Sequence, residues 1–117
     1  MSTDIAKLIH NRLIGRHVED FPVSCAALGP NTVLTNSTSK YLVLLAYVLD
    51  CATPGNTVTW EDSDGVVYSG AMPFSETGGL VAPSNPDGWL MLPPGKSLVL
   101  YLSAAAPVSG HLTRALI

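Results

Sequence analysis

The residues of this sequence that could take part in catalysis or bind a metal are three histidines and one acidic run. His10, His17 and His111 have no acidic or cysteine neighbour at the spacing of metal ligands, so we interpret each as a solvated or hydrogen-bonded histidine. The run Glu61 to Gly65 resembles the start of a calcium loop but lacks the later acidic ligand that closes the coordination shell. We interpret it as a solvated turn, with a weak calcium site as the alternative, and expect no metal and no cofactor.

Motifs of nucleophilic and phosphate chemistry are missing from the sequence. A nucleophile elbow needs Gly-x-Ser-x-Gly, and the nearest strings, "YSGA" and "VSGH", do not fit it. Gly78-Gly79 is flanked by neither a lysine nor a helix start, so it is not a phosphate loop. We therefore expect a protein that is not an enzyme. An active site assembled from residues far apart in the sequence is the alternative.

The composition indicates one domain that hides apolar surface in an assembly. Of the 117 residues, 47% are hydrophobic and only 13% are charged, so a lone monomer would struggle to cover its surface with polar groups. The longest apolar run, Tyr41 to Leu49, is too short to cross a bilayer and predicts a buried strand and no membrane contact. Cys25 and Cys51 lack Cys-x-x-Cys spacing and are interpreted as buried free thiols. The N-terminus lacks the features of a secretory signal.

Residues 1–30 are expected to form an arm ahead of a compact domain at residues 31–117. A short amphipathic helix over residues 3–14 is predicted from apolar residues at helical spacing, namely Ile5, Leu8, Ile9, Leu13 and Ile14. The segment 15–30 has mixed charges, two prolines and no clear period. A helix packed on its own domain is the alternative. The net charge of −3 argues against nucleic-acid binding, but the arm has basic residues that suit an acidic docking surface: Lys7, Arg12 and Arg16.

From Thr32 onward, short apolar or alternating runs are separated by glycine, proline, asparagine or aspartate, which is typical of an all-β, antiparallel β-sandwich with a jelly-roll-like arrangement. Tight turns are expected at Pro54-Gly55-Asn56, Asp64-Gly65 and Pro93-Pro94-Gly95-Lys96. The predicted strands are Thr32 to Thr35, Lys40 to Cys51, Thr57 to Asp62, Val66 to Ser69, Ala71 to Ser75, Gly79 to Ala82, Trp89 to Leu92, Ser97 to Ser103 and Val108 to Leu116.

Tyr41 to Leu49 is apolar on both faces of the predicted strand. Only one face of a strand in a two-sheet sandwich can point at the core, so the other must lie under the arm or against a neighbouring subunit. Each apolar side chain covered in this way contributes roughly 1.5–3 kcal/mol, which favours a hydrophobic oligomer. The residues assigned to that oligomer interface are Tyr41, Val43, Leu45 and Tyr47.

The two tryptophans, Trp60 and Trp89, are candidate glycan contacts, because aromatic rings stack on sugars and small sandwiches often bind carbohydrate. Core packing is the competing interpretation, especially for Trp60, which alternates with Val58 in a strand.

Four segments together carry a resemblance to a known group of proteins: "KYLVLLAYVLDC", "VTWEDSDGVVYSGAMPFS", "GGLVAPSNPDGWLML" and "PPGKSLVLYLSAAAPVSGHLTRALI". The span from about Lys40 to Leu116 resembles small β-sandwich virion proteins of tailed bacteriophages, and the arm makes it most similar to capsid decoration, or cement, proteins. The pattern of the group is matched at Leu98, Leu100, Leu102, Ser103, Val108, Gly110, Leu112 and Thr113.

This resemblance implies a homotrimer on the outer surface of the capsid, made in the host cytoplasm. Its arms would reach onto neighbouring subunits of the major capsid protein through Ile5, Lys7, Leu8, Arg12 and Arg16, and so stabilise the head. The prolines and the Asp87-Gly88 turn of "GGLVAPSNPDGWLML" pre-set a nearly uncharged loop that suits a mating surface. The alternative is a carbohydrate-binding or structural module of a tail fibre or baseplate.

Overall fold

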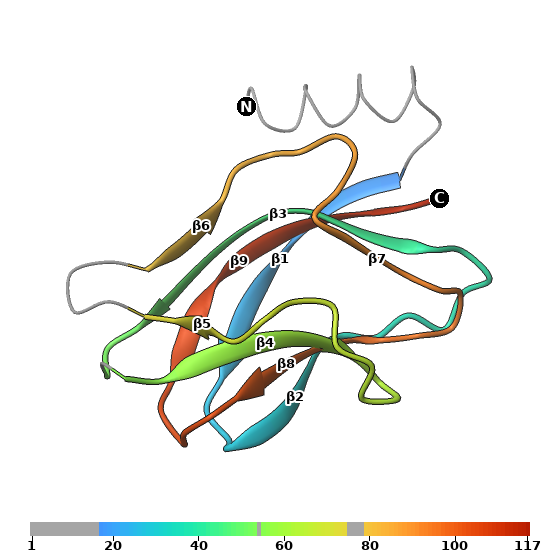
Figure 1. Ribbon diagram of the computed structural model, residues 1–117. Helices are drawn as coiled ribbons and strands as arrows, with labels where there is room; N and C mark the ends of the chain where they lie inside the picture. The colour runs from blue at the N-terminus through green and yellow to red at the C-terminus, as the bar shows by residue number, and fades with distance from the viewer. Residues whose placement is uncertain (1–16, 54, 75–78) are drawn as a thin grey trace.

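The computed structural model describes residues 17–53, 55–74 and 79–117 (Figure 1), and these residues form strands and turns without a helix. The predicted helix over residues 3–14 lies outside the described residues. The strands are β1 (His17–Cys25), β2 (Gly29–Leu34), β3 (Leu42–Cys51), β4 (Thr57–Asp62), β5 (Met72–Pro73), β6 (Leu80–Ala82), β7 (Leu90–Leu92), β8 (Leu98–Leu102) and β9 (Val108–Leu116).

The strands form two antiparallel sheets (Figure 1). Sheet A has the order β1-β9-β3-β6, and β7 also pairs with β3, at Leu42–Leu44, where β6 pairs with Tyr47–Leu49. Sheet B has the order β2-β8-β4-β5. Side chains of both sheets contribute to one core cluster, in which Leu44 and Leu49 of β3 meet Trp60 of β4 and Leu100 of β8. The prediction of an all-β protein with antiparallel sheets is therefore confirmed.

Strand β8 has its three leucines on one face, as the sequence predicts, although Val99 on the other face is buried as well. Leu98, Leu100 and Leu102 are fully buried and face the core, while Tyr101 on the opposite face of sheet B is exposed. Burial of each leucine contributes about 2 kcal/mol, so this strand is a main source of the stability of sheet B.

Strand β1 corrects the predicted arm, because residues 17–25 belong to sheet A. This segment pairs with β9 over its whole length, from His17↔Leu116 to Cys25↔Val108. Pro22 is tolerated because β1 is an edge strand, where one side of the backbone needs no partner in the sheet. The boundary that the sequence places at residue 30 is therefore too late, and β2 also starts before it, at Gly29.

The hairpin after β4 is shorter than predicted. Only one bridge, Glu61↔Val67, forms where a strand was expected at residues 66–69, and the strand expected at residues 71–75 is reduced to β5. The backbone N–H of Trp60 donates to the Ser69 hydroxyl at 2.9 Å instead of to a backbone carbonyl. The Ser69 hydroxyl thus takes the place of a backbone carbonyl of a neighbouring strand, and the regular pairing ends here.

A bulge at Leu45 changes which side chains of β3 face the core. Leu44 pairs with Arg114 and Ala46 with Thr113, so Leu45 is an extra residue in β3. Before the bulge, Leu42 and Leu44 point into the core; after it, Tyr47 and Leu49 do. The four residues that strict alternation assigns to one outer face are therefore divided between the two faces.

The two cysteines are buried free thiols, as predicted. Cys25 and Cys51 both pair with Val108, from opposite sides of β9, so they lie two strands apart. Two strand spacings amount to about 9–10 Å, which exceeds the span of a disulfide. The distance between the two cysteines therefore prevents a disulfide between them.

Candidate functional site

The outer face of sheet A, which points away from sheet B, carries a second apolar cluster. Val18, Val43, Leu45 and Ala115 form it and are buried, although they do not belong to the core between the sheets. Val18 and Ala115 are paired across β1 and β9, and Ala115 is paired with Val43 across β9 and β3. The cluster thus crosses three adjacent strands at one end of the sheet.

Exposed apolar side chains continue this cluster toward the solvent. Met91 of β7 pairs with Val43 and so shares its face, and its side chain is 51% exposed. Tyr41 and Ile117 exchange backbone hydrogen bonds of 2.9 and 3.1 Å one pair beyond Leu42↔Leu116, which places them on the outer face. They are 45% and 44% exposed. We call Tyr41, Met91 and Ile117, together with the buried cluster, the apolar surface.

The loop 83–89 interrupts the edge of sheet A beside this surface, where it connects β6 to β7 (Figure 1). Backbone hydrogen bonds attach it to the bulge: Asn85 N–H donates to Leu45 O at 2.9 Å, and Trp89 N–H donates to Leu44 O at 2.8 Å. Gly88 has a positive φ of 84°, and an added Cβ would lie 2.3 Å from a Val43 methyl group. Glycine is therefore favoured at position 88, and the two hydrogen bonds to β3 hold the loop against the cluster.

Trp89, the last residue of this loop, is one of the two predicted glycan contacts. The residue is 49% exposed, and its indole N–H donates to Pro83 O at 2.9 Å. The ring is therefore fixed and partly open to solvent, which suits contact with a partner or a sugar.

Trp60, the other predicted glycan contact, is only 1% exposed and lies in the core, so this prediction is wrong. Its ring meets the Tyr47 ring edge-on, with centroids 5.3 Å apart. Tyr47 also donates its hydroxyl to Met72 Sδ at 3.4 Å. Tyr47 is therefore a core residue, which corrects its assignment to the oligomer interface.

Of the other residues of the predicted interface, Tyr41 is exposed, whereas Val43 and Leu45 are buried within the single chain. Tyr41, Val43 and Leu45 all contribute to the outer face of sheet A, and the structure brings them together with Met91 and Ile117. The five predicted capsid-binding residues, Ile5, Lys7, Leu8, Arg12 and Arg16, lie outside the described residues.

On β1 and β9 the opposite end of the same face is polar. Asp20 and Thr113 are paired across β1 and β9, and the Thr113 hydroxyl donates to Asp20 Oδ1 at 2.6 Å. Pro22 and exposed His111 follow along the same two strands. The outer face therefore changes from apolar to polar along β1 and β9, whereas on β3 and β6 it stays apolar at this end: Val48 is opposite His111, and Val81, opposite Val48, is 69% exposed.

The acidic turn after β4 is held together by its own hydrogen bonds. Asp62 is buried; its Oδ1 accepts hydrogen bonds from Asp64 N–H and Val66 N–H, and its Oδ2 accepts one from the Tyr68 hydroxyl. Lys96 forms an ion pair with Asp64. Throughout the described part of the chain, no group of three or more histidine, cysteine or acidic residues could hold a metal ion. The carboxylate of Asp62 is thus engaged by groups of the turn itself, which favours the interpretation as a structural turn.

Acid is expected to weaken the contribution of Asp62 to the free energy of unfolding. Burial alone would raise the pKa of Asp62, but the hydrogen bonds from Asp64, Val66 and Tyr68 and the charge of Lys96 lower it below its ordinary value. A lowered folded pKa stabilises the protein above the unfolded pKa of about 3.9, and this stabilisation is lost as pH falls through the folded value. Asp62→Asn should lower the free energy of unfolding by about 2 kcal/mol at pH 7.

Urea unfolding of both proteins at pH 7 and at about pH 3 would measure this difference, which should shrink in acid. Asp64→Asn is the control, because the ion pair of Asp64 is exposed and should be worth less than about 1 kcal/mol. A difference between wild type and Asp62→Asn that is equal at both pH values would contradict the assignment.

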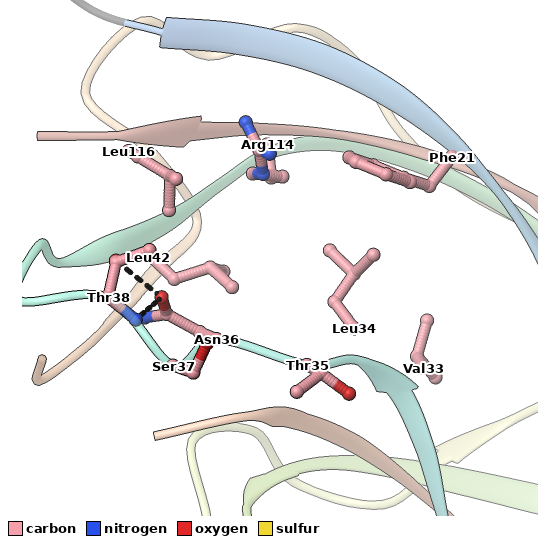
Figure 2. Close-up of a pocket in the computed structure, with 10 residues that line it drawn as sticks. All are labelled: Phe21, Val33, Leu34, Thr35, Asn36, Ser37, Thr38, Leu42, Arg114 and Leu116. Carbon is pink, nitrogen blue, oxygen red and sulfur yellow. Dashed lines mark hydrogen bonds between the residues drawn. The ribbon is translucent and has the colours of Figure 1, made fainter. Parts of the chain in front are cut away.

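A pocket of about 250 Å³ opens between the two sheets (Figure 2). Sheet A contributes Phe21, Leu42, Arg114 and Leu116, and the end of β2 with the turn after it contributes Val33, Leu34, Thr35, Asn36, Ser37 and Thr38. Asn36 Oδ1 accepts hydrogen bonds from the N–H and hydroxyl of Thr38, which fixes this turn. Sequence analysis missed the pocket, because its residues come from three separate segments.

The fold and the apolar surface define an all-β protein of two packed antiparallel sheets with an apolar patch on the outside of one sheet. Comparison of the chain with protein-family models, curated proteins and solved structures finds no match. Within residues 17–53, 55–74 and 79–117, no helix is long and apolar enough to span a membrane.

Proposed function

We propose that this protein is a structural component of a phage virion, a decoration or cement protein that forms a trimer on the outer capsid surface and clamps neighbouring major capsid subunits. The observation that carries the proposal is the apolar surface of sheet A. It exposes Tyr41, Met91 and Ile117 around a buried apolar cluster, next to a loop whose shape is fixed. Contiguous apolar side chains on the outside of a small domain are typical of protein interfaces.

The strand order supports a jelly-roll as part of this proposal. Strands β6 and β7 pair with the same strand on either side of the loop 83–89, so they count as one interrupted strand. The eight resulting strands form two four-stranded sheets and alternate between them except at β4 and β5, which are both in sheet B. Double-sheet folds with eight strands are common in viral capsid proteins and lectins.

The mechanism follows from multiple weak contacts. Copies joined through their apolar surfaces present several arms at once, so that binding of one arm raises the effective concentration of the others. In this mechanism Ile5, Lys7, Leu8, Arg12 and Arg16 contact the major capsid protein. Because the assembled shell binds and the free subunit does not, the clamp stabilises the head by linkage.

Light scattering of the purified protein and co-sedimentation with assembled capsids test this function. The wild type should be a trimer and should sediment with capsids, whereas Met91→Asp should become monomeric and lose at least about tenfold in capsid binding. Deletion of residues 1–16 should keep the trimer and abolish capsid binding. Tyr101→Asp is the control, because Tyr101 is exposed on sheet B. A wild-type monomer that does not join capsids would overturn the proposal.

Trp89 favours a second candidate, a carbohydrate-binding module of a tail fibre or baseplate. Its fixed, half-exposed ring can stack on a sugar. Binding of the wild type to a glycan array, abolished in Trp89→Ala, would support this function over the first.

A further inference from the structure

Arg114 is a cation on the face of sheet A that carries the core residues. It pairs with Leu44 of β3 and Glu19 of β1, and Leu44 is fully buried between the sheets. Residues directly opposite one another across a sheet share a face, so Arg114 points toward sheet B. Its side chain is only 12% exposed, which is unusual for an arginine.

The surroundings of Arg114 keep its charge in a largely apolar place. Its guanidinium carbon lies 5.0 Å from the centre of the Phe21 ring, and one of its nitrogens lies 3.7 Å from Glu19 Oε1. Burial lowers the pKa of Arg114, and the Glu19 carboxylate partly opposes this. Arginine nevertheless stays protonated at neutral pH, so the pocket of Figure 2 contains a positive charge.

The geometry of the pocket limits what it can hold. Its volume of about 250 Å³ corresponds to about eight water molecules at about 30 Å³ each. Leu34, Leu42 and Leu116 form aliphatic walls, and Figure 2 shows Leu34 pointing across the pocket toward the strands that carry Arg114 and Phe21. The polar side chains of the turn 36–38 lie at one end. The site combines one cation with apolar walls.

We propose that this pocket binds a small monocarboxylate with a compact apolar body, independently of the virion role proposed above. The carboxylate pairs with Arg114, whose planar guanidinium matches its two oxygens, and the apolar body packs against Leu34, Leu42 and Leu116. A dianion such as phosphate fits less well, because the apolar walls offer its further charge no cation. A neutral ligand of the same shape forgoes the charge-assisted hydrogen bonds.

Glu19 is at the rim of this site and is compatible with such a ligand. Its contact with Arg114, at 3.7 Å, is longer than a hydrogen bond, and its side chain is 46% exposed. A bound carboxylate at hydrogen-bond distance would add charge-assisted hydrogen bonds that the 3.7 Å contact with Glu19 does not supply.

Titration of the full-length protein with benzoate, followed by amide chemical shifts in NMR, tests the proposal. Benzoate should produce saturable shifts confined to Phe21, residues 33–38 and Arg114 and its neighbours. Benzamide, its neutral isostere, should bind at least about tenfold more weakly. Arg114→Gln should cause a similar loss of benzoate affinity, while Arg114→Lys, which keeps the charge but not the planar fork, should lose less.

Val33→Phe provides a second variant that leaves Arg114 in place and narrows the pocket, and it should also lose benzoate binding. Thermal unfolding of each variant shows whether it is folded. Equal affinity for benzoate and benzamide, unchanged binding by Arg114→Gln, or shifts outside the pocket would each overturn the proposal. Capsid binding and trimer formation should be unaffected by Arg114→Gln, so failure of this site and failure of the virion function are distinguishable.

Discussion

Replacement of Gly110 by alanine is expected to lower the free energy of unfolding by about 4 kcal/mol. Gly110 lies within β9, where an added Cβ would be 1.8 Å from the carbonyl oxygen of Val48 and 2.8 Å from its carbon. Its φ is +154°. Because β9 is held between β1 and β3, neither neighbouring backbone can move away without breaking a ladder. Urea unfolding followed by tryptophan fluorescence measures the loss.

Gly70→Ala is the matched control for this experiment. A Cβ on Gly70 meets no heavy atom within 4 Å, so the free energy of unfolding should change by less than about 0.5 kcal/mol. Soluble yield gives a second readout if Gly110→Ala is too unstable for a full unfolding curve. Equal urea midpoints for the two variants would mean that β3 and β9 do not approach as closely as described.

The bulge at Leu45 predicts opposite consequences for two tyrosines of the same segment. Tyr47→Ala should lower the free energy of unfolding by about 3 kcal/mol, because it removes the ring that packs on Trp60 and leaves a cavity. Tyr41→Ala should change stability by less than about 0.5 kcal/mol, because Tyr41 is 45% exposed. Urea unfolding measures both changes.

Self-association should be affected by the substitution at Tyr41 and not by the one at Tyr47, the opposite of the effect on stability. Under the proposed function, Tyr41→Ala weakens self-association measured by light scattering, while Tyr47→Ala, at a temperature where it is folded, leaves it unchanged. A stable Tyr47→Ala that no longer associates would place Tyr47 on the outer face, and would argue for an uninterrupted register in β3.

Alternation and turn chemistry were sufficient to predict the strands with a clear pattern. In β8 the leucines at 98, 100 and 102 alternate with other residues, and all three are buried as expected. The turn at Asp64-Gly65 forms with a positive φ of 80° at the glycine. These features depend on residues close in sequence, which is why the sequence contains the information.

The features that sequence analysis missed depend on tertiary context. Pro22 and the neighbouring acidic residues of β1 are unfavourable in most strands, so the sequence did not predict a strand here. An edge strand accepts them, and the position of β1 at an edge is known only from the structure. The run Leu42 to Leu45 is apolar throughout, so nothing in it marks where the bulge reverses the pattern. The position of Arg114 between the sheets becomes visible only when β9 is aligned with Leu44 of β3.

The edges of the two sheets determine how copies of this protein can meet. Each edge of the described sheets is interrupted: β1 contains Pro22, β2 contains Pro30, β5 has two residues including Pro73, and β6 and β7 have three residues each. A continuous intermolecular ladder needs a longer row of unpaired N–H and C=O groups than any of these offers. The described edges therefore disfavour growth of an intermolecular sheet, and contacts between copies of this protein would have to be made by side chains.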